Sequence, residues 1–231
     1  KHRSGTEREE RELSQLNVIS SVLWFNLEEM LHVTTQMVLP HRQHSHAAAL
    51  ALAKCESDEK KLRELSAHLS ERFPFMVMRS PVPNVIDVDL FKEIPFALEH
   101  DPELLKFSGW VTSYANDLRN VIEERNKWIN RAAETNFKGG FSMDDIREQI
   151  RIQAHLGDVE VINSLMYIRM LRTMLSKLDA SLKRYSHLKR TKLKGTEPQA
   201  LAEAVRELER LAKEIRPDLP LDAERVDSEQ Q

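Results

Sequence analysis

The chain has 231 residues, a formal net charge of −3 and 41% hydrophobic residues. This composition excludes a disordered or a membrane-embedded chain, and the net charge argues against a nucleic-acid binder that works by overall charge. Six glycines and nine prolines are about half the usual share, which disfavours strand-and-turn architectures. The single cysteine, Cys55, excludes an intramolecular disulfide framework and a cysteine-rich zinc site.

The first residue is Lys1 rather than a methionine. Basic residues often follow a transmembrane helix on its cytoplasmic side, so an anchor upstream of this start is one interpretation. A cut inside a polar linker is the other. The sequence itself contains no run of about 18 apolar residues, and we expect residues 218–231 to be a disordered acidic tail.

Helical periodicity dominates the sequence. Apolar residues at three- and four-residue spacing predict a first helix over residues 8–39, with the polar Asn26 inside the apolar stripe. Pro40 is expected to stop or kink this helix. A second helix is predicted over residues 44–73. Residues 74–100 hold four prolines but are too apolar for a free linker, so we expect an ordered crossover that packs on the bundle.

Three further helices have recognisable starts. Asp101 is followed by a proline and an acid, a typical N-cap and first turn. Ser142 and Asp145 are spaced close to a capping box, and Thr196 begins another. Gly157 indicates a kink or a tight packing point. These helices are predicted over residues 101–137, 143–192 and 197–216.

The predicted fold is all-α, an elongated antiparallel bundle of four to five long helices with a Pro-rich crossover. Residues 1–217 would form a single domain. Helices this much longer than the average of about 11–12 residues favour a rod or a coiled-coil-like dimer.

Two groups of residues suggest metal sites. Glu29 and His32 form the Glu-x-x-His spacing of di-iron bundles, but that site needs a second copy, and one match is expected by chance. His41, His44 and His46 follow Pro40. In a loop all three could bind zinc, whereas on a helix His46 would lie apart from the other two. The alternatives are a polar helix–helix connection or a pH-sensitive corner, because imidazoles gain charge below neutral pH.

Arg63 and His68 match the Arg-x4–6-His pattern of the HEPN class of helical ribonucleases, in which such a pair would attack and stabilise a scissile phosphate. Chance matches are expected in a chain this rich in arginine, and the apolar residues around the pair predict an amphipathic helix whatever its role.

A basic run without acids could contact phosphates of nucleic acid or lipid headgroups. It comprises Lys183, Arg184, Lys189, Arg190, Lys192 and Lys194. Only Tyr185 is available nearby for base stacking, and positive charge is favourable at a helix C-terminus in any case, so a solvated helix end is the preferred interpretation. The sequence has no dinucleotide-binding or P-loop motif, and no cofactor is expected.

Several stretches together resemble the soluble part of uncharacterised single-pass bacterial membrane proteins. Residues 23–30 read Leu-Trp-Phe-Asn-Leu-Glu-Glu-Met, residues 101–105 read Asp-Pro-Glu-Leu-Leu, residues 114–118 read Tyr-Ala-Asn-Asp-Leu, and residues 123–126 read Glu-Glu-Arg-Asn. The resemblance covers residues 10–135 and implies an upstream anchor and no catalytic residues.

These observations predict a non-enzymatic interaction domain, the soluble part of a membrane-anchored bacterial protein. It would lie on the cytoplasmic side of the inner membrane or in the cytoplasm, and act through a protein partner or self-association rather than through nucleic acid. The alternatives are a metal-independent HEPN-like ribonuclease using Arg63 and His68, and a metal- or pH-responsive sensor using His41, His44 and His46.

Overall fold

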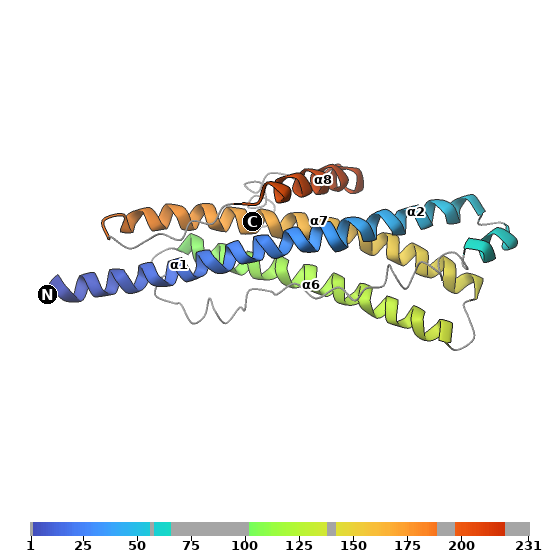
Figure 1. Cartoon of the computed structure of the whole chain (residues 1–231), viewed down its shortest axis with the longest axis horizontal. Coiled ribbons are helices and arrows are strands. Elements are labelled where there is room, and N and C mark those ends of the chain that lie inside the picture. The colour runs from blue at the N-terminus through green and yellow to red at the C-terminus, as the bar shows by residue number, and fades with distance from the viewer. Residues whose placement is uncertain (1, 56–57, 66–101, 138–141, 189–196, 220–231) are drawn as a thin grey trace.

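The computed structural model describes residues 2–55, 58–65, 102–137, 142–188 and 197–219 (Figure 1). Within these ranges the chain is helical and contains no strand, which confirms the predicted all-α bundle. The elements are α1 (His2–Val33), the π-helix η1 (Thr34–Val38), α2 (Leu39–Cys55), a helical segment at 59–65, α6 (Pro102–Phe137), α7 (Met143–Leu182), the 3-10 turn η2 (Lys183–Tyr185) and α8 (Gln199–Ile215).

The central element is α7, which packs against α1, α2, α6 and α8. Four side-chain pairs fix the helix directions: Glu12 with Tyr185, His41 with Gln153, Glu103 with Lys177, and Arg125 with Glu160. The first two pairs join the α1–α2 helix to α7 and η2, and the last two join α6 to α7. Within both groups the residue number on the α7 side falls as the number on the other helix rises. Therefore α7 is antiparallel both to the α1–α2 helix and to α6, which run in the same direction (Figure 1).

Two clusters of buried apolar residues hold the bundle together. The larger one joins α1 and α8 with residues 104–122 of α6 and residues 161–182 of α7. The smaller one lies where α2 ends, and it brings Leu52 and Cys55 together with Leu62, Ile146 and Ile150. The Cys55 thiol is buried and donates to the Ala51 carbonyl at 3.1 Å. Burial of the long apolar stripes supplies the main driving force for this elongated shape.

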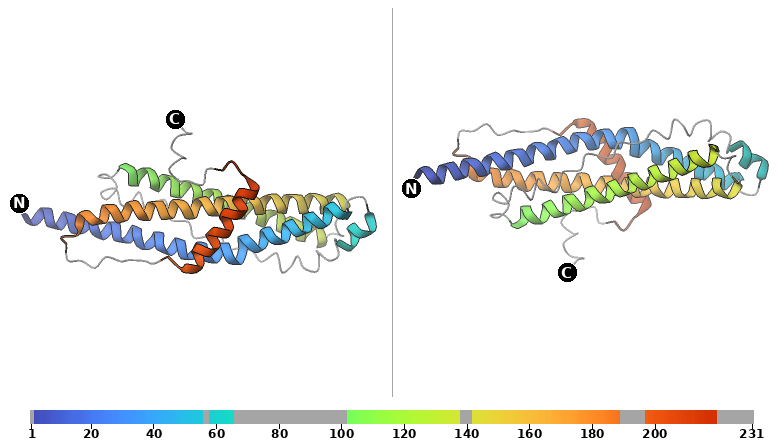
Figure 2. Two further views of the ribbon diagram at one scale, coloured as in Figure 1. Left: turned by 90° about the horizontal axis from the view of Figure 1, so that it is seen from above. Right: turned by 90° about the horizontal axis from the view of Figure 1, so that it is seen from below.

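Pro40 does not end the first helix, so the predicted break between residues 39 and 44 is wrong, whereas the alternative expectation of a kink agrees with the structure. A proline lacks the N–H, and its ring collides with the carbonyl four residues earlier in a regular α-helix. Here η1 widens the helix just before the proline, and the Leu39 N–H donates to the Thr34 carbonyl, five residues back. The helix bends in this region and continues as α2 (Figure 2). Such single π-turns are frequently found at functional sites.

Other predicted boundaries are partly confirmed. The start at Ser142 is a true capping box: the Asp145 N–H donates to Ser142 Oγ at 3.1 Å, and the Ser142 N–H donates to Asp145 Oδ2 at 3.0 Å. The N-cap of α8 is Pro198, without a side-chain cap, so the capping box predicted from Thr196 does not start this helix. Thr196 itself lies outside the described residues.

Three predicted helices can be compared with the observed bounds. The predicted helix at 101–137 matches α6, whereas the one at 143–192 ends early, because α7 stops at Leu182. The predicted helix at 44–73 is wrong as a single element, since α2 ends at Cys55 and a new helical segment follows Asp58. Residues 66–73, the crossover at 74–100 and residues 220–231 of the expected tail lie outside the described ranges. None of the described helices is both long and apolar enough to cross a membrane.

Candidate functional site

The histidine-rich segment lies on α2, directly after the π-turn. His41 and His46 contact α7 through their side chains, whereas His44 is exposed. Because the segment is a helix, the loop in which three histidines would meet at zinc does not form. Among the described residues, no group of three or more His, Cys, Asp or Glu side chains is placed to hold a metal ion.

Glu160 of α7 forms the centre of a buried polar cluster between three helices. Its side chain is 0% exposed. Arg125 Nη1 of α6 lies 3.0 Å from Glu160 Oε1 and 3.1 Å from Oε2, and His41 Nδ1 of α2 lies 2.9 Å from Oε2. An isolated buried carboxylate would be costly. The two partners compensate this cost and join α2, α6 and α7 at one point.

The second ring nitrogen of His41 contacts Gln153, which precedes Glu160 by seven residues on α7. His41 Nε2 lies 2.8 Å from Gln153 Oε1. With the amide oxygen facing the ring, both imidazole nitrogens must donate, and His41 is doubly protonated. With the amide turned over, its NH2 group donates and His41 is neutral. The cluster thus fits either protonation state of His41, each with its own orientation of Gln153.

A second, more exposed cluster lies beside the first. Asp158 Oδ1 accepts from Arg42 Nε at 3.0 Å and from His46 Nε2 at 2.9 Å. Arg42 Nη2 also lies 3.7 Å from Glu214 Oε2 of α8. One arginine therefore connects α2, α7 and α8.

Gly157 allows α2 and α7 to approach each other at this level. A Cβ atom at position 157 would lie 3.1 Å from Arg42 Cα and 3.1 Å from Ser45 Oγ. The tight packing point predicted for this glycine is confirmed.

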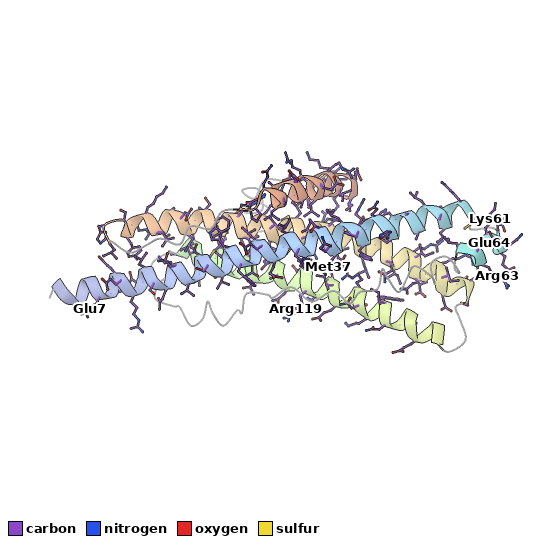
Figure 3. The ribbon with its side chains drawn as sticks, in the orientation of Figure 1. Glu7, Met37, Lys61, Arg63, Glu64 and Arg119 are labelled. Carbon is purple, nitrogen blue, oxygen red and sulfur yellow. The ribbon has the colours of Figure 1, made fainter. Side chains whose placement is uncertain are left out.

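The other candidate residues lie elsewhere. Glu29 is partly buried on α1 and His32 is exposed. Arg63 lies on the segment at the end of the bundle away from the N-terminus (Figure 3), where its exposed side chain pairs with Glu59 at 2.6 Å. Its proposed partner His68 lies outside the described residues, so the ribonuclease hypothesis stays a prediction.

Only the start of the basic run is described. Lys183 and Arg184 are exposed at the end of α7, and Arg184 Nη2 donates to Ser181 Oγ at 3.3 Å. The rest of the run, Lys189, Arg190, Lys192 and Lys194, falls outside the described ranges. Contact of this run with phosphates also stays a prediction.

Sequence reasoning did not single out Arg125, Gln153 or Glu160. A signal was present, because Arg125 lies in the apolar seam of α6 between Ile122 and Ile129, at a position that faces the core. A charge at such a position indicates a buried partner. The identity of that partner, 35 residues further along the chain, depends on how the helices pack.

No protein-family model, curated protein or solved structure matches this chain significantly.

Proposed function

We propose that the protein is a non-enzymatic helical-bundle domain that acts by binding another protein. The observation that supports this function is a pair of apolar side chains on the outer face of α1. Val18 is 46% exposed and Phe25 is 49% exposed, and they lie seven residues apart, which places them on the same face of the helix. Exposed Ser14 and Ser21 share this face, and their short side chains leave the apolar groups accessible.

The interior supports the same interpretation. The buried carboxylate Glu160 is engaged by Arg125 and His41, which lie on two neighbouring helices. These contacts fasten helices together rather than present a reactive group to solvent. Val18 and Phe25 are exposed apolar side chains that share one helix face, unlike the single exposed Leu50 of α2, and such grouping favours a protein contact.

Site-specific photo-crosslinking in the source cells tests this function. A photoreactive phenylalanine replaces Phe25 in one variant and Leu50 in a control, since Leu50 is an apolar residue of α2 that is 65% exposed. We expect one discrete adduct from position 25 that is lost when Val18→Ser is added, and no such adduct from position 50. Equal labelling at both positions, or no adduct at 25, would contradict the proposal.

We further propose that this contact takes place near a membrane. The support is the resemblance of residues 10–135 to the soluble part of single-pass bacterial membrane proteins. Fractionation of the source cells, followed by the intact mass of the native protein, tests this location. Recovery only in the soluble fraction would overturn it.

The contacts of His41 favour a second candidate function, a pH-responsive bundle. Its ring joins Glu160 and Gln153. Protonation decides whether the Nε2 atom donates or accepts, and with it the orientation of the Gln153 amide. We expect the near-ultraviolet circular dichroism spectrum to change on acidification. This change should be lost in His41→Gln and kept in His44→Gln. Identical pH profiles for the wild type and His41→Gln would rule this candidate out.

A further inference from the structure

α8 is a short helix that lies across the long helices, over the region where α1 and α2 meet (Figure 2). It packs on α7 and α1. Its buried residues recur at three- and four-residue spacing: Leu201, Ala204, Val205, Leu208, Leu211 and Ala212. This spacing is that of an amphipathic helix bound in a groove.

The ion pairs described between the α8 segment and the rest of the bundle all have the same orientation. In the ion pairs that connect this segment to the rest of the bundle, the acid belongs to residues 197–214 and the arginine belongs to α2 or α7. The pairs are Glu197 with Arg172, Glu209 with Arg169 at 2.7 Å, and Glu214 with Arg42 at 3.7 Å. The side chains of Arg42 and Arg169 are only 14% and 13% exposed, so they form part of the surface beneath the helix. That surface combines an apolar floor with fixed positive charges.

α8 is kept on the bundle mainly by the face that it buries. A helix of 17 residues is marginally stable by itself in water, so its stability comes from the face that it buries. Its N-cap, Pro198, makes no side-chain hydrogen bond to the helix. The acids in its ion pairs are partly exposed, from 29% for Glu197 to 50% for Glu214, so salt weakens these pairs.

We propose that the surface beneath α8 is a docking site for an acidic amphipathic helix of a partner protein, and that α8 occupies this site as an intramolecular competitor. The proposal extends the proposed function, because it adds a second contact surface, separate from Val18 and Phe25, and names the class of helix that this surface accepts. The arginines select acidic side chains at the flanks of the incoming helix, and the apolar floor accepts its stripe. Displacement of α8 would also separate Glu214 from Arg42, which lies beside Asp158 and His46.

A labelled synthetic peptide of residues 197–219 serves as the probe, and fluorescence anisotropy measures its binding to the full chain. The variant Glu197→Gln/Glu209→Gln/Glu214→Gln weakens the resident helix without changing its size. We expect the peptide to bind this variant at least tenfold more tightly than the wild type, because the internal competitor is weaker. Glu203→Gln, on the exposed face of α8, should leave binding at the wild-type level.

Two further measurements make the result specific. A peptide carrying Leu208→Asp should not bind, because Leu208 is 0% exposed under α8. Arg169→Gln/Arg172→Gln, added to the triple variant, should remove the tenfold gain, because the peptide acids lose their partners. If the triple variant loses helical circular dichroism, Glu209→Gln alone is compared with the wild type.

Absence of binding to a folded variant, or equal binding of the Leu208→Asp peptide, would overturn the proposal. Sedimentation of the triple variant tests whether a second copy of the chain occupies the site. We expect a monomer, and a concentration-dependent dimer would show that the site takes α8 of a second copy instead of a partner helix. The crosslinking experiment uses Phe25 of α1 and none of the residues around α8. The proposed function can therefore stand even if the docking site beneath α8 is disproved.

Discussion

Gly157 of α7 lies directly against the backbone of Arg42 in α2, with 3.1 Å between Arg42 Cα and the position where a Cβ of residue 157 would be. The close approach brings Arg42 and His46 within reach of Asp158 and sets the depth at which His41 reaches Glu160. The absence of one side chain on α7 thus determines the geometry of both polar clusters.

Gly157→Ala should destabilise the protein by about 1 kcal/mol, since overpacking against a neighbouring backbone costs more than the gain in helix propensity. The matched control is Gly109→Ala in α6, where an added Cβ meets nothing within 4 Å. This control should gain about 0.5–1 kcal/mol. Urea unfolding of both variants measures the difference, and an equal gain at both positions would show that α2 can move away freely.

Glu160→Gln should lower the free energy of unfolding by about 3–5 kcal/mol, because Arg125 would remain buried without its carboxylate. As a control, Glu59→Gln at the exposed pair with Arg63 should leave the thermal midpoint unchanged.

The double variant Arg125→Met/Glu160→Leu should lose less stability than Glu160→Gln, because the carboxylate and the guanidinium are removed together, although His41 Nδ1 loses its carboxylate partner. Thermal unfolding of the wild type, of Glu160→Gln and of the double variant makes this comparison. A Glu160→Gln variant as stable as the wild type would mean that Arg125 is compensated by other groups.

Tyr167→Phe should cost about 1–3 kcal/mol, because the Asn26 carbonyl oxygen loses its donor in a buried environment. Tyr167 Oη donates to Asn26 Oδ1 at 3.1 Å, and Asn26 Nδ2 donates to the Val22 carbonyl at 2.8 Å. Adding Asn26→Leu should recover most of the loss, as a double-mutant cycle would show. Simple additivity of the two losses would argue against this hydrogen bond.

All three tyrosines of the chain should resist ionisation in the folded protein. Burial raises the pKa of Tyr114 and of Tyr167. Burial, together with the hydrogen bond to Glu12, raises the pKa of Tyr185 to about 12. An unfolded tyrosine ionises near pH 10, so the unfolded state releases protons first and stability falls as the pH rises from about 10 to 12.

Phenolate absorbance, followed during alkaline titration, checks this expectation in folded protein and in guanidinium. Glu12→Gln should lower the pKa of Tyr185, because the negative charge beside the phenol is removed. A titration near pH 10 for all three tyrosines in the folded protein would contradict the burial of their side chains.

The sequence predicts α6 and the start of α7 well because each has an apolar stripe and a recognisable start. The capping box at Ser142 and the bounds of α6 follow from local chemistry alone. Pro40 misled the prediction because the compensating π-turn leaves no residue signature in Thr34–Val38. Asn26 was recognisable as a polar residue in an apolar stripe, but its partner Tyr167 lies 141 residues away.

The candidate site was predictable only in part for the same reason. The histidines after Pro40 were recognised by their density, whereas Glu160 and Arg125 acquire their meaning when three helices pack at one level. The metal interpretation failed because it required a loop, and local sequence could not show that the helix continues past the proline.

The continuity of α1, η1 and α2 has a mechanical consequence. From His2 to Cys55 the backbone is one continuous helix, bent near the π-turn, with a contour length of about 80 Å at 1.5 Å per residue. Two helices joined by a flexible turn would move independently, but a continuous rod transmits torque. A small rotation imposed on α1 near its N-terminus would therefore also turn His41 relative to Glu160, near the middle of the molecule.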